Sequence, residues 1–75
     1  MRYHIKTADS KKSTGARYSL WYSEVRPDYD KELWQVQRVY VIVCTALYRG
    51  DRIITNVFTY ESEEDAERMF NKFVG

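Results

Sequence analysis

The stretch from Gln35 to Tyr48 constrains the fold of this chain more than any other feature. Its side chains alternate with the period of a β-strand, yet both of the resulting sets are apolar: Val39, Val41, Val43 and Thr45 on one side, Tyr40, Ile42, Cys44 and Ala46 on the other. A strand with two apolar faces belongs in the middle of a sheet and needs cover on both sides. We therefore expect a helix over one face, and a partner molecule is a candidate for the other.

Three further strands are predicted around this central one. Residues Arg2–Thr7 alternate as a short strand, and a polar turn or loop, Ala8–Gly15, leads to a second alternating segment, Arg17–Val25. Beyond the central strand, the sequence Arg49–Arg52 predicts a hairpin turn, which is followed by a partner strand over Ile53–Tyr60. The order of these segments predicts antiparallel pairing between neighbours.

A helix is predicted at the C-terminal end of the sequence. Ser62 is a suitable N-cap residue, and Asp65 stands where the acidic residue of a capping box belongs. Apolar residues then recur with helical spacing at Ala66, Met69, Phe70 and Phe73, which predicts one face that packs on the sheet. The predicted fold is α+β: a single domain over residues 1–75, with an antiparallel sheet of about four strands and one C-terminal helix packed on one face.

The segment Arg26–Trp34 interrupts the strand pattern. Pro27 opens it and charged residues follow, which is typical of a loop. A short helix over Asp30–Gln37 is the alternative, with Leu33, Trp34 and Gln37 on one side. The sequence leaves both readings open.

The composition excludes several classes of function. A chain of 75 residues with one histidine, His4, and one cysteine, Cys44, offers no credible catalytic combination and too few ligands for a zinc site. Its three glycines lack nucleotide-binding spacing. We expect no enzymatic activity, no cofactor and no metal. No segment approaches the ~18 apolar residues of a membrane span, and no signal peptide is recognisable, so we expect a cytoplasmic protein.

The aromatic content points to binding. Aromatic residues make up 16% of the chain, including seven Tyr and two Trp, more than so small a core can hide. Tyr, Trp and Arg are also the residue types enriched at binding hot spots. The first hypothesis is therefore a protein-binding module, with the acidic start of the helix as a second contact that mimics phosphate charge. Its predicted partner-binding residues are Trp21, Tyr22, Arg26, Tyr29, Trp34, Glu63, Glu64 and Glu67.

Two alternatives remain. The net charge is only +1, but residues 1–26 carry six basic and two acidic residues, or +4, whereas residues 61–75 carry two basic and five acidic residues, or −3. A small RNA- or DNA-binding module would use the basic third, with Lys11, Lys12 and Arg17 on phosphates and Tyr18 or Trp21 stacked on bases. A homodimer that closes the uncovered sheet face on itself is the other alternative.

The chain also resembles a class of small viral proteins. Its size, its meander with polar loops and its final helix, S-E-E-D-A-E-R-M-F-N-K-F, are similar in build to small phage-encoded inhibitor proteins, including anti-CRISPR proteins and inhibitors of host RNA polymerase. The resemblance implies stoichiometric binding to a large host complex that handles nucleic acids, without turnover, in the host cytoplasm. Such proteins share no signature motif, so it assigns no residue a role.

Overall fold

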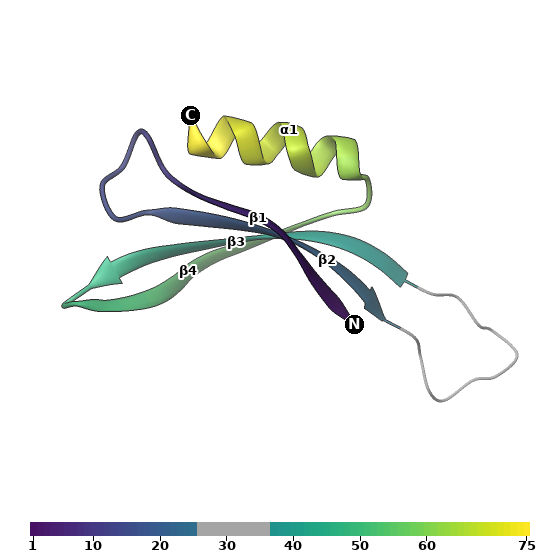
Figure 1. The fold of residues 1–75 in the computed structure, drawn as a ribbon, viewed down its shortest axis with the longest axis horizontal. Coiled ribbons are helices and arrows are strands. Elements are labelled where there is room, and N and C mark those ends of the chain that lie inside the picture. The colour runs from purple at the N-terminus through teal and green to yellow at the C-terminus, as the bar shows by residue number, and fades with distance from the viewer. Residues whose placement is uncertain (26–36) are drawn as a thin grey trace, which may run out of the picture.

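The computed structural model describes residues 1–25 and 37–75, and it shows an α+β fold (Figure 1). Four strands form one antiparallel meander in the order β1-β2-β3-β4, and helix α1 lies over one face of it. This confirms the predicted fold class. The bounds of the elements are β1 Arg2–Asp9, β2 Arg17–Val25, β3 Gln37–Tyr48, β4 Asp51–Tyr60 and α1 Glu63–Val74. The predictions for residues 26–36, including Arg26, Tyr29 and Trp34, lie outside the described residues.

The hairpin between β3 and β4 is tighter than the sequence suggested. Its turn consists of Arg49 and Gly50, with φ angles of 50° and 84°, so β4 already begins at Asp51. Positive φ at both central residues is the type I′ geometry, whose twist matches that of the adjoining strands. β1 is likewise longer than predicted and continues to Asp9.

Both edge strands of the sheet contain an irregularity in register. In β1 the pairing with β2 shifts between His4 and Lys6, so that Ile5 has no register partner. In β4 the shift falls beside Thr55, because Cys44 pairs with Asn56 and Thr45 pairs with Ile54. Such bulges increase local twist and are common at sheet edges.

The helix begins where the sequence predicted, and it ends at Val74 with Gly75 as its C-cap. The Ser62 hydroxyl accepts a hydrogen bond from the Asp65 backbone N–H at 3.1 Å, which confirms the N-cap. At the other end the Gly75 N–H donates to the Asn71 carbonyl at 3.0 Å, and Gly75 has a φ of 93°. This left-handed residue ends the helix, as glycine commonly does.

The hydrophobic core is thin and lies on the helix side of the sheet. Leu20 and Ile42 pair in register, and they pack against Ala66 and Phe70 of α1. Cys44 is also buried, as the sequence predicted, on the same side of β3 as Ile42. Met69 and Phe73, the rest of the predicted helix stripe, are half-buried around this centre. The other half-buried side chains that pack against it are Ala8, Tyr18, Tyr40, Phe58, Tyr60 and Val74.

Candidate functional site

The sheet face opposite α1 contributes none of the buried residues in the described part of the chain. We call it the open face and define it by the residues that line a shallow depression of about 610 Å³: Arg2, Ser19, Trp21, Ser23, Val41, Val43, Thr45, Ile54, Val57 and Thr59. These residues come from all four strands, and no described element covers them (Figure 1). The face exists because β2 and β3 alternate, which sends Leu20 and Ile42 to the helix and their neighbours away from it.

The centre of the open face is apolar. Trp21 pairs in register with Val41, and Val43 pairs with Val57 of β4. Val57 is 55% exposed and Ile54 is 66% exposed, so this strip remains in contact with water. Serine and threonine side chains surround it. An aliphatic strip with a hydroxyl border has the composition expected of a face that packs against another protein layer.

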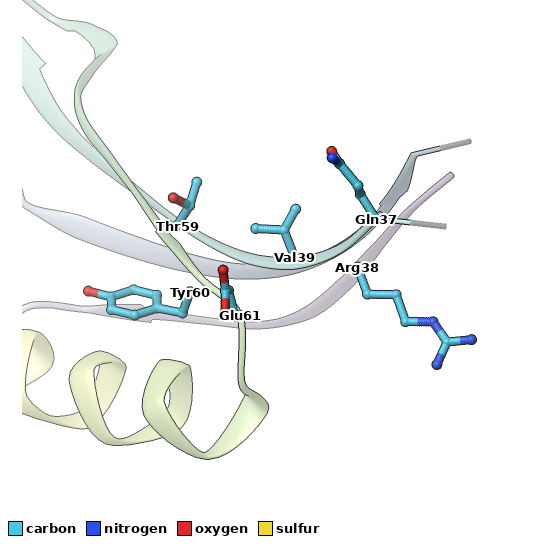
Figure 2. Close-up of a pocket in the computed structure, with 6 residues that line it drawn as sticks. All are labelled: Gln37, Arg38, Val39, Thr59, Tyr60 and Glu61. Atoms are coloured by element: carbon cyan, nitrogen blue, oxygen red, sulfur yellow. The ribbon is translucent and has the colours of Figure 1, made fainter. Parts of the chain in front are cut away.

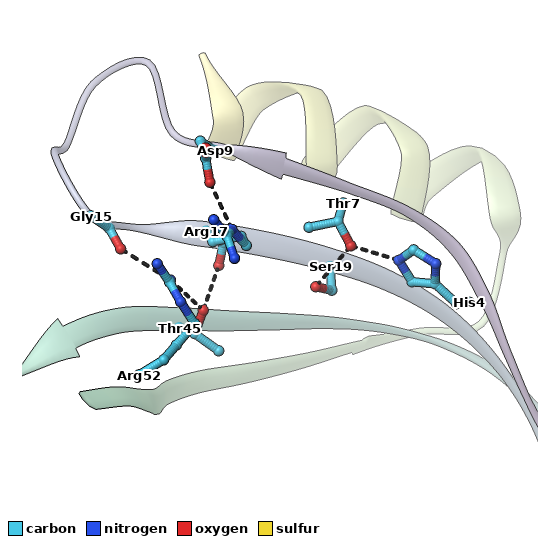
Figure 3. Close-up of polar contacts among 8 residues, drawn as sticks. All are labelled: His4, Thr7, Asp9, Gly15, Arg17, Ser19, Thr45 and Arg52. Carbon is cyan, nitrogen blue, oxygen red and sulfur yellow. Dashed lines mark hydrogen bonds and ion pairs between the residues drawn. The ribbon is translucent and has the colours of Figure 1, made fainter. Parts of the chain in front are cut away.

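A chain of hydrogen bonds borders the open face at β1. The His4 Nε2 lies 2.6 Å from the Thr7 Oγ1, and the Thr7 hydroxyl donates to the Ser19 Oγ at 3.2 Å (Figure 3). The His4 ring also lies against the Trp21 indole, with the ring centroids 4.9 Å apart. His4 therefore contacts both the hydroxyl groups of this border and the Trp21 ring.

Two arginines near this border, Arg17 and Arg52, are engaged by other groups of the protein. Arg17 donates from Nε to the Asp9 carboxylate at 2.7 Å, and this hydrogen bond and charge lower the pKa of Asp9 below its ordinary value of 3.8. Arg52 reaches across β3 and donates to the Thr45 hydroxyl at 3.0 Å and to the Gly15 carbonyl at 3.2 Å (Figure 3). Neither guanidinium is arranged as a free phosphate site.

On the helix side of the sheet, one tyrosine from each strand forms a row across it. Tyr3 pairs with Tyr22, Tyr22 with Tyr40, and Tyr40 with Tyr60. The ring centroids of the first two pairs lie 6.0 and 5.1 Å apart. Burial raises the pKa of Tyr22, and the adjacent Glu24 carboxylate raises it further. The sequence shows each tyrosine in its own strand, but only the register reveals the row.

A second hollow lies at the edge of the sheet where β3 begins and β4 ends. Gln37, Arg38 and Val39 of β3 border it together with Thr59, Tyr60 and Glu61 (Figure 2). The Arg38 side chain points away from Val39 and Thr59 in this view and lies 3.6 Å from the Glu24 carboxylate. The polar groups of the hollow therefore do not converge on a common point, as a catalytic site would require.

The structure separates the predicted partner-binding residues. Trp21 lies on the open face, whereas its neighbour Tyr22 lies on the helix side, so a flat partner on the open face meets only the first. Glu63 and Glu64 are exposed in the first turn of α1. Glu67 forms an ion pair with Lys6 of β1, which joins the acidic helix to the basic part of the sequence.

The residues of the nucleic-acid alternative do not share one surface either. The Lys11 N–H donates to the Val74 carbonyl at 2.9 Å, and the Lys12 Nζ donates to the Lys72 carbonyl at 3.5 Å, so this turn lies at the end of α1. Tyr18 stacks on Phe73 under the helix at 5.6 Å. Burial, and next the neighbouring Cys44 thiol, raise the pKa of Tyr18. This places Tyr18 away from Arg17, which lies on the other side of β2.

Residues 1–25 and 37–75 contain no cluster of three or more potential metal ligands. Within the same part of the chain, no helix has the length and apolar character needed to cross a bilayer. Comparison with models of protein families, with curated proteins and with solved structures finds no match to this chain.

Proposed function

We propose that this chain is a non-enzymatic protein-binding module that buries its open face against a larger protein. The observation that carries the proposal is the apolar strip of Trp21, Val41, Val43 and Val57 on a sheet face without a covering layer in the described part of the chain. Within residues 1–25 and 37–75, the five buried residues lie either on the sheet face under α1 or in α1 itself. The removal of such apolar surface from water by a partner contributes favourably to the free energy of binding.

The chemistry of the open face favours a protein over a nucleic acid. Single-stranded nucleic acids are bound by several stacking rings interleaved with free cations. Here the centre of the face is aliphatic, with Trp21 as its one large aromatic side chain among the described residues. Arg17 is paired with Asp9, and Arg52 is held by Thr45. Valine, isoleucine and threonine side chains pack well against another protein surface but offer little to bases or phosphates.

The resemblance to small phage-encoded inhibitors suggests which protein is bound. Our proposal is a host complex that handles nucleic acids, which this module would inhibit by stoichiometric binding. The exposed Glu63 and Glu64 at the start of α1 would form a second contact with a basic groove of that complex.

The test compares capture of a host protein by variants of the full chain. Trp21→Ala removes the main anchor, and Ser23→Arg adds a long charged side chain to the open face without removing apolar surface. Tyr48→Ala is the matched control, because Tyr48 is a 56% exposed aromatic residue outside the open face. Circular dichroism establishes that each variant is folded. We expect one protein to be retained at one copy per chain by wild type and Tyr48→Ala and lost with the two open-face variants.

Two results would overturn the proposal. The first is retention of the same protein by all variants, because the open face would then not be the binding surface. The second is micromolar binding of random oligonucleotides that Trp21→Ala abolishes and that weakens steeply with salt, with a log-log slope of about −0.7 per neutralised phosphate on single strands. The module would then bind nucleic acid.

A further inference from the structure

The β3–β4 hairpin exposes apolar side chains on both of its sides near the turn. Leu47 and Tyr48 are each 56% exposed before the turn, and Ile53 and Ile54 are 42% and 66% exposed after it. Because side chains alternate along a strand, Leu47 and Ile54 lie on the side of the open face. Tyr48 and Ile53 lie on the side of α1. This end of the hairpin therefore has no polar side that would identify it as an ordinary solvent-facing turn.

Basic side chains lie at the same end of the sheet. Figure 1 shows the β1–β2 loop and the β3–β4 turn at this end, close to the C-terminal end of α1. The Arg52 guanidinium joins the two segments, because it donates from β4 to the Gly15 carbonyl of the loop at 3.2 Å. The loop carries Lys11 and Lys12, and the turn itself carries Arg49. Two segments that are distant in the sequence thus bring cations next to exposed apolar side chains.

Arginines offset the acidic side chains at this end. Asp9 is paired with Arg17, and the charge of Asp51 is offset by that of the adjacent Arg52. The acidic start of α1 lies toward the other end of the sheet (Figure 1). Three cations of the loop and the turn form no ion pair with a described residue: Lys11, Lys12 and Arg49. The surface is therefore both positively charged and apolar.

We propose that this surface binds an anionic lipid bilayer, with the hairpin in the headgroup region and the cations on anionic headgroups. We call it the hairpin end and define it as Lys11, Lys12, Leu47, Tyr48, Arg49 and Ile53. Peripheral binding to membranes combines burial of apolar side chains in the interface with attraction of basic residues to anionic lipids. Tyrosine is also enriched at the level of the headgroups. The Arg49 guanidinium lies 5.3 Å from the centroid of the Tyr48 ring, so the charge and the ring are side by side.

The chemistry of the hairpin end favours a lipid surface over a nucleic acid. Phosphates would use the cations, but bases need rings on which to stack. Tyr48 is the one aromatic residue of the hairpin end, and Leu47 and Ile53 offer only aliphatic surface. A bilayer interface takes up aliphatic side chains without a matching groove, and its anionic headgroups attract the cations beside them.

This contact is independent of the proposed function, because the two surfaces do not share an anchor. Protein capture depends on Trp21 of the open face, whereas lipid binding depends on the hairpin end. Tyr48→Ala should therefore retain the captured protein and weaken binding to vesicles. Trp21→Ala should do the reverse.

The test measures co-sedimentation of the full chain with vesicles of phosphatidylcholine and phosphatidylserine, mixed two to one, and with vesicles of phosphatidylcholine alone. Each basic residue near an anionic surface strengthens binding about fivefold, so the mixed vesicles should bind the chain at least ~20-fold more tightly. Added salt should weaken this preference, because it screens the cations.

Two variants and their controls locate the contact. Arg49→Asn removes a cation and leaves Asn-Gly in the turn, which is a favoured sequence for type I′ geometry, and it should weaken binding to mixed vesicles about fivefold. Arg38→Gln is its control, because it removes an exposed cation at the opposite end of the sheet. Tyr48→Ala should also weaken binding, whereas Tyr3→Ala, at a 48% exposed tyrosine of β1, should not. Circular dichroism establishes that each variant is folded.

Three results would overturn the proposal. The first is absence of binding to the mixed vesicles, or equal binding to both kinds of vesicle. The second is equal weakening by Arg49→Asn and Arg38→Gln, which would show attraction by overall charge without a defined surface. The third is binding of random oligonucleotides that Arg49→Asn weakens, with no binding to vesicles, which would assign the hairpin end to a nucleic acid. Each of these leaves the capture test of the open face unaffected.

Discussion

Neighbouring residues of β3 provide a direct comparison of the two sheet faces. Ile42 is fully buried under α1, whereas Val41, the next residue toward the N-terminus, is half-buried on the open face. We predict that truncation to alanine at these two positions has very different effects on the free energy of unfolding of the free protein.

The expected magnitudes follow from burial. Removing a fully buried isoleucine side chain down to alanine costs about 2–5 kcal/mol, because the lost transfer energy adds to the cost of a cavity. Val41→Ala removes the equivalent of two methylene groups, each worth about 0.8 kcal/mol when fully buried, so half-burial gives roughly 0.8 kcal/mol. A chain of 75 residues has a total stability of about 4–11 kcal/mol, so Ile42→Ala removes a large share of it.

The measurement is urea unfolding followed by circular dichroism at low micromolar concentration. If Ile42→Ala leaves too little folded protein, Ile42→Val, with an expected cost of about 0.5–1.5 kcal/mol, takes its place and is compared with Val41→Ala per methylene removed. Equal costs per methylene on the two faces would refute the reasoning, because the open face would then be as well covered as the core.

Three further predictions concern single contacts. Ser62→Ala should lower the stability by about 1 kcal/mol in urea unfolding, because the Asp65 N–H loses its acceptor, whereas Ser62→Asp should retain most of the stability. Arg17→Gln should raise the pKa of Asp9 toward 3.8, as measured by NMR titration of its carboxyl carbon; an unchanged pKa would contradict the assigned cause. Since the folded-state pKa of Asp9 is lowered, its contribution to stability is present above the unfolded pKa and lost as the pH falls through the folded value, and Arg17→Gln should remove this acid-side loss. The buried Cys44 should react with a thiol reagent only as the protein opens, so its rate should rise with urea, and rapid labelling of the native state would contradict its burial.

The sequence alone predicted the elements well, because each has a strong local signal. The alternation in Arg17–Val25 predicted β2 to the residue, and the Ser62 cap with the apolar spacing of Ala66 and Phe70 predicted both the start and the buried side of α1. Burial of Cys44 followed from the apolar run around it. Such signals depend on neighbours in the chain, so they are visible without a structure.

The candidate site was predicted less well, because its geometry depends on register between strands. Alternation already put Trp21 and Tyr22 on opposite sides of β2, yet their shared aromatic character placed both in one predicted binding set. The bulges at Ile5 and Thr55 decide which side chains face which way, and they have no local sequence signal here. The tyrosine row and the engagement of Arg17 by Asp9 likewise became visible only after the strands were paired.

The position of α1 has a consequence for aggregation. Two polar contacts hold the helix on the sheet: the Lys6–Glu67 ion pair near its middle, and the hydrogen bond from the Lys11 N–H to the Val74 carbonyl at its end. If they open and α1 swings away, Leu20 and Ile42 become exposed on a sheet whose other side is already bare. A sheet that is exposed on both sides can stack into fibrils. The helix therefore opposes aggregation in addition to completing the core.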